Sequence, residues 1–61
     1  MNKANRRDSE LAKQYASLGM MDTAAKTLSA AIRYSLTESD KRKLRVIATE
    51  LNISNHPDFI C

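Results

Sequence analysis

The residue types that perform catalytic chemistry are scarce in this chain. His56 is the only histidine and Cys61 the only cysteine, and both lie at the C-terminal end. Nucleophilic catalysis requires a thiol held beside a base, and a terminal cysteine has no second element to hold it there. We therefore expect His56 to be solvent-exposed and Cys61 to be unreactive in this sense.

The carboxylates form no obvious acid/base pair. Asp8 and Glu10 are two positions apart on an expected helix and so point in different directions, while Glu38 and Asp40 lie at the start of another. One cysteine allows neither an intrachain disulfide nor a cysteine-based zinc site, and no phosphate-binding glycine loop is present. The sequence predicts no catalytic residue, no cofactor, no metal site and no enzyme activity.

Basic residues form the strongest local charge feature. The run comprises Lys41, Arg42, Lys43 and Arg45. It favours a DNA-binding helix-turn-helix, or an RNA-binding regulator, that uses the start of the third helix. Glu38 weighs against this because it lies at the same end and, at i, i+4 spacing, would pair with Arg42.

A second basic cluster lies in or near the first helix. It comprises Lys3, Arg6, Arg7 and Lys13. It is either the solvated face of that helix or, if it lies beside the Lys41 run in the fold, part of a nucleic-acid surface. The net charge of +3 is modest and is also explained by a well-solvated surface.

Composition indicates a single small all-α domain. A chain of 61 residues with one glycine and one proline favours helix. The start of the chain is polar, without a signal-peptide core, and no apolar run is long enough to cross a membrane. We expect a cytoplasmic protein.

Periodicity and capping residues predict three helices, over residues 5–18, 23–35 and 38–51, with a non-helical tail over 52–61. Gly19 is expected to end the first helix at positive φ, and Asp22 to cap the second. Thr37 and Asp40 have the spacing of a capping box, and Asn52 ends the third helix with Ile53 folding back. The inward faces are Leu11, Ala12, Tyr15 and Leu18; Ala24, Ala25, Leu28, Ala31 and Ile32; and Leu44, Ile47, Ala48 and Leu51.

One stretch of the chain, residues 11–36, resembles a single tetratricopeptide repeat, a helical hairpin. The residues that carry the likeness are Leu11, Tyr15, Gly19, Ala24, Leu28 and Ala31. The departures are Ala12, Met21 and Leu36, where the repeat has glycine, an aromatic residue and proline. An alanine-rich antiparallel hairpin outside the family is the alternative. The resemblance implies protein or peptide binding on a helical surface, with a third helix packing on the second.

Apolar residues remain after the three inward faces are assigned. They are Met20, Met21, Tyr34, Val46, Phe59 and Ile60. We expect them to form a protein interface, most simply that of a symmetric homodimer. The alternative is that Phe59 and Ile60 fold back over the third helix and cover the others within one chain.

The leading hypothesis is therefore a small non-enzymatic protein-interaction module that self-associates. The second hypothesis is a small basic DNA- or RNA-binding regulator. Small, basic, helical proteins without catalytic groups are typical of bacteriophage early proteins that redirect host proteins, although no motif in this chain indicates that origin.

Overall fold

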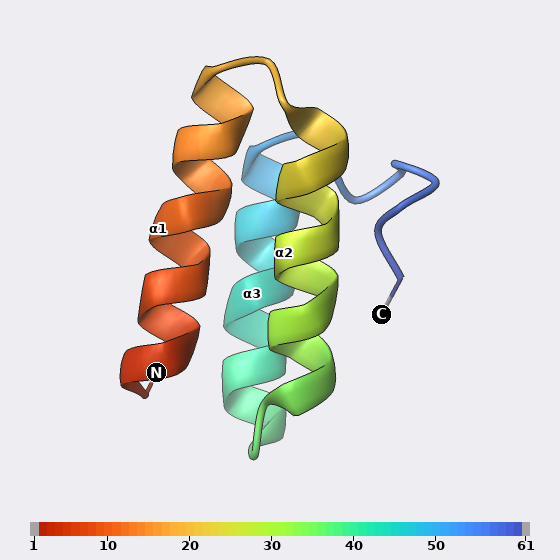
Figure 1. Cartoon of the computed structure of the whole chain (residues 1–61). Coiled ribbons are helices and arrows are strands. Elements are labelled where there is room, and N and C mark those ends of the chain that lie inside the picture. Colours follow the sequence, from red (N-terminus) through yellow and green to blue (C-terminus); the bar gives the residue numbers. More distant parts are fainter. Residues whose placement is uncertain (1, 61) are drawn as a thin grey trace.

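The computed structural model describes residues 2–60, which form three helices. Helix α1 spans Lys3–Ser17, α2 spans Met21–Tyr34 and α3 spans Glu38–Glu50. Helices α1 and α2 form an antiparallel hairpin, and α3 runs antiparallel to α2 behind it (Figure 1). Helix α2 packs extensively on both of the others, whereas α1 and α3 touch less. The prediction of an all-α hairpin plus a third helix is confirmed.

Two helix ends use the same hydrogen-bond pattern. After α1, the Gly19 N–H donates to the Ala16 carbonyl (3.0 Å) and the Met20 N–H to the Tyr15 carbonyl (2.8 Å). After α3, the Ile53 N–H donates to the Ala48 carbonyl at 2.8 Å. Both ends are Schellman motifs, which require a left-handed residue. Gly19 (φ 81) and Asn52 (φ 60) supply it. The positive φ of Gly19 is as predicted, and Asn52 follows the cap residue Leu51 at the predicted end of the third helix.

The N-termini of the helices follow the sequence less closely. Asn2 caps α1, because its side chain accepts from the Asn5 N–H at 2.8 Å. Thr37 caps α3, as predicted, by accepting from the Asp40 N–H at 3.1 Å. The prediction that Asp22 caps α2 is wrong. The Schellman turn leads straight into the helix, so Met20 is the cap residue and Asp22 lies in the first turn, near the positive end of the helix dipole.

The core is built largely from alanine. Its buried members are Ala12, Ala24, Ala25, Leu28, Ala31, Ile32, Leu44, Ala48 and Ile53. Ile47 and Leu51 of α3 are only partly buried against it. The side chains of Leu28, Leu44 and Ile53 are the largest that are fully buried. Small side chains on α2 let the neighbouring helices approach closely, so a modest apolar volume fills the interior.

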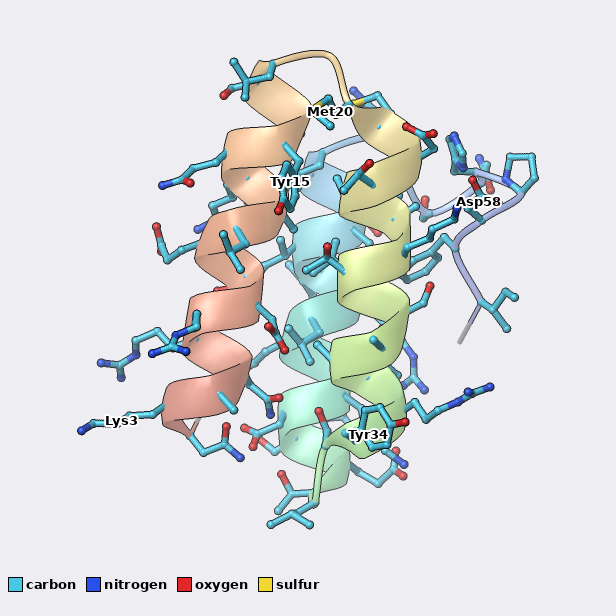
Figure 2. The ribbon with its side chains drawn as sticks, viewed as in Figure 1. Lys3, Tyr15, Met20, Tyr34 and Asp58 are labelled. Atoms are coloured by element: carbon cyan, nitrogen blue, oxygen red, sulfur yellow. The ribbon has the colours of Figure 1, made fainter. Side chains whose placement is uncertain are left out.

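Helix α1 turns a different face inward from the one its leucines predict. Its buried residues are Asn5, Ser9 and Ala12, and Leu18 is 73% exposed. Leu18 follows Ala12 by six residues, which at 3.6 residues per turn places it on another side of the helix. Leu11 is half-buried, and Tyr15 lies half-buried at the seam between α1 and α2 (Figure 2).

A buried polar contact ties the start of α1 to the end of α2. The Asn5 side-chain amide donates to Ser35 Oγ at 3.1 Å, and Ser35 Oγ donates to the Ala31 carbonyl at 2.7 Å. Asn5 is only 3% exposed, and a buried amide of this kind is costly without a partner. The contact therefore joins α1 and α2 at the end of the hairpin away from its turn.

No helix within residues 2–60 is both long enough and apolar enough to span a membrane.

The hairpin turn gives a direct stability test. Gly19→Ala should lower the free energy of unfolding by about 1 kcal/mol, because an L-residue is strained at this φ. No atom lies within 4 Å of the position that a Cβ would take, so backbone strain is the expected cause. Urea denaturation measures the change. Ser17→Ala, an exposed control two residues earlier, should change stability by less than about 0.5 kcal/mol. Equal stabilities for the two variants would contradict the assignment.

Candidate interaction surface

The tail after α3 folds onto α2 and is held there by one serine. Ser29 Oγ accepts from the Ile60 N–H at 2.8 Å and donates to the Asp58 carbonyl at 3.3 Å. Phe59, between these two residues, packs against the core. Figure 2 shows the tail, with Asp58 labelled, beside α2. The tail is non-helical, as predicted, but its hydrogen bonds join it to α2.

The position of His56 differs from the expectation that it is solvent-exposed. Its side chain is 28% exposed, and its Nδ1 accepts from the Asp58 N–H at 3.1 Å. Its backbone N–H donates to the Ile53 carbonyl at 2.8 Å, and its carbonyl accepts from Phe59. These hydrogen bonds join His56 to neighbouring residues of the tail, and its side chain is partly buried. Cys61 lies outside the described residues.

Two adjoining hollows lie between the tail and the helices, and we call them together the Ile60 groove. The first has a volume of about 270 Å³ and is lined by Lys26, Ser29, Ala30, Arg33, Tyr34, Asp58 and Ile60. The second, of about 260 Å³, is lined by Ile32, Arg33, Lys41, Arg45 and Ile60. Arg33 and Ile60 belong to both. The groove therefore combines apolar side chains with cations drawn from two helices.

The charge of the groove is positive. Its cations are Lys26, Arg33, Lys41 and Arg45, and Asp58 is its one lining carboxylate. Lys41 Nζ also lies 3.5 Å from Glu38 Oε1. Glu38 thus pairs with Lys41, one position before the Arg42 partner that helical spacing predicts. The resulting excess of positive charge suits an anionic group.

The predicted nucleic-acid run is divided by the fold. Lys41 and Arg45 line the groove, while Arg42 and Lys43 are exposed and do not. The basic cluster of α1 begins at the same end of the bundle as α3 (Figure 1). Lys3 nevertheless points outward on the α1 side (Figure 2), and Lys13 Nζ lies 3.9 Å from Glu10 Oε1.

The predicted interface residues are likewise separated. Met20, Tyr34, Val46 and Ile60 are exposed, whereas Met21 and Phe59 pack against the core. Met20 lies at the hairpin turn and Tyr34 at the opposite end of the bundle (Figure 2). Of these residues, Tyr34 and Ile60 line the first hollow together.

Sequence reasoning missed the α2 contribution to the groove. Lys26, Ala30 and Arg33 recur at i, i+4 and i+7, the spacing of one helix face. This spacing is visible in the sequence, but the apolar periodicity of α2 identifies only its buried face, and says nothing of a function for the opposite face. Leu36, which is 88% exposed, is a further apolar surface residue, and it lies just after α2, where no helical spacing assigns it a face.

Within residues 2–60, no group of three or more histidine, cysteine, aspartate or glutamate side chains is placed to hold a metal ion. Comparison of the chain with protein-family models, with curated proteins and with solved structures finds no match.

The serine that anchors the tail can be tested alone. Ser29→Ala removes both hydrogen bonds between α2 and the tail. It should destabilise the docked tail, relative to the undocked tail, by about 1 kcal/mol. Amide hydrogen exchange at Ile60 should then accelerate severalfold, while exchange in α1 stays unchanged. Ser54→Ala, at an exposed tail position, is the matched control. Unchanged exchange at Ile60 in the Ser29 variant would show that Phe59 packing alone holds the tail.

Proposed function

We propose that this chain is a non-enzymatic protein-interaction module that binds another protein through the Ile60 groove. The observation that carries the proposal is the pair Tyr34 and Ile60, which are 75% and 70% exposed and line one basic hollow. Apolar side chains this accessible, with arginine beside them, are typical of the centre of a protein interface.

The antiparallel packing of α2 and α3 favours this proposal over the helix-turn-helix alternative (Figure 1). A DNA-binding helix-turn-helix crosses its two helices at a steep angle so that the second can enter the major groove. Here α3 lies along α2, and the lining of the groove includes Ala30 and Ile32, which suit a protein side chain. Nucleic-acid binding remains the second candidate because the cations of the groove would attract phosphates.

The resemblance to a tetratricopeptide repeat is part of the proposal. Supporting it are the hairpin, the positive φ of Gly19 and the burial of Ala24, Leu28 and Ala31 on α2. Repeats of this kind bind protein segments on helical surfaces. The chain is small, basic and helical, as bacteriophage early proteins often are. A bacterial host protein is therefore the first kind of partner to test.

Site-directed photocrosslinking tests the proposed function. A benzophenone side chain replaces Tyr34 in the groove or, as the control, Gln14 on the exposed side of α1. After irradiation in a bacterial lysate, we expect protein adducts from position 34 that survive nuclease and are absent from position 14. Adducts that consist of nucleic acid, or that disappear with nuclease, would replace this function with the second candidate.

Self-association is a further proposal, which uses exposed apolar residues outside the groove, chiefly Leu36 and Val46. A symmetric dimer should raise the melting temperature as protein concentration increases, because association stabilises the folded state by mass action. Val46→Asp should abolish this dependence, since it would place an unpaired charge in the contact. Sedimentation equilibrium gives the mass directly. A monomer with a concentration-independent melt would refute self-association and leave partner binding untouched.

A further inference from the structure

We infer that the Ile60 groove accepts an acidic segment with apolar anchor residues, supplied by a protein other than this chain. The inference rests on the proposed function and specifies the chemistry of the partner. Three features of the groove carry it: the arrangement of its cations, the exposed apolar pair, and the poor fit of a second copy.

The cations surround the apolar centre of the groove. Arg33 lines both hollows, so its guanidinium is available to a ligand in either of them. Lys41 and Arg45 of α3 line the second hollow. Lys26 precedes Arg33 by two helical turns on the same face of α2. An arginine offers paired N–H donors that match a carboxylate. Carboxylates along a bound segment would therefore find partners at both ends of the groove.

The apolar residues give the segment its anchoring points. Ile60 stands between the two hollows, and the hydrogen bond from its N–H to Ser29 fixes its backbone. Tyr34, which is 75% exposed, lines the first hollow beside Ile60. Because the tail is already docked, a partner does not bear the entropy cost of ordering it. Apolar side chains of the partner would gain burial against these residues.

A second copy of this chain is a poor occupant on electrostatic grounds. The groove itself is positively charged, so a second copy would have to present an acidic surface to it. Glu10 and Glu38 are already paired with lysines of the same chain, at 3.9 Å and 3.5 Å. The acidic residues of the sequence are spread over the three helices and the tail, and no two of them are adjacent, so we assign the acidic segment to another protein.

Selection from a random peptide library tests the inference without a known partner. The full chain, biotinylated at its N-terminus, selects displayed peptides, and the enriched sequences are sequenced and resynthesised with a fluorescent label. We expect the enriched peptides to be rich in aspartate and glutamate, with leucine, isoleucine or aromatic residues at recurring positions. Their binding, measured by fluorescence anisotropy, should weaken as salt is raised.

Paired charge-reversal variants locate the binding site. Arg33→Glu with Arg45→Glu should weaken the enriched peptides at least about tenfold. Arg6→Glu with Arg7→Glu changes net charge equally on α1, away from the groove, and should change binding by less than about threefold. All four arginines are exposed, so circular dichroism should show both variants folded. Ile60→Ser should also weaken binding, because it removes an apolar anchor without changing charge.

The possible outcomes distinguish the acidic-segment inference from the protein-interaction function on which it rests. Acidic, apolar peptides that lose affinity only in the groove variants support the inference. Enriched peptides that are not acidic, or that bind both reversal variants equally, overturn it while leaving the protein-interaction function in place. If no peptide is enriched, and a labelled DNA duplex or RNA strand binds in a way that the groove reversal abolishes, both the inference and the proposed function fail.

Discussion

Close packing between alanine-rich helix faces governs the interior of this protein. Ala24, Ala25 and Ala31 are buried on α2, and α2 is the helix that contacts both others. Small side chains allow short interhelical distances, so α1 can fill its side of the interface with Ser9 and Ala12 instead of leucine. Leu28 lies on the same face of α2 as Ala24 and Ala31, at i, i+4 and i+7 spacing. With Leu44 and Ile53 it supplies the largest fully buried side chains of the core.

That packing explains why the surface carries so many large apolar side chains. Because α1 buries small residues, Leu18 stays exposed. Tyr34 and Leu36 sit at the far end of the bundle, where α2 ends and the chain turns into α3. A larger protein would cover such residues with further elements, but a domain of this size buries a smaller share of its chain. The exposed side chains are therefore a consequence of the close-packed interior and are available for contacts with other proteins.

The tail links this interior to the proposed binding surface. The Schellman motif at Asn52 reverses the chain after α3 and buries Ile53 in the core. From there Phe59 reaches the core again, and Ser29 fixes the backbone on either side of it. Ile60 is left exposed at the junction of the two hollows. One short segment thus closes the core on its inner side and forms one wall of the groove on its outer side.

Residues close together in the chain are enough to predict the three helices, the helix ends at Gly19 and Asn52, and the Thr37 cap. Each depends on residues within one or two turns, where backbone sterics and short-range hydrogen bonds dominate. Tertiary structure alone decided which face of α1 is buried, since the burial of Asn5 depends on Ser35, thirty residues away. It also decided which cations gather around Ile60, because Arg33 of α2 meets Lys41 and Arg45 of α3 only when the two helices and the tail pack. Helical periodicity gives each residue its angle on its own helix, but the rotation of one helix against another follows from the packing of both.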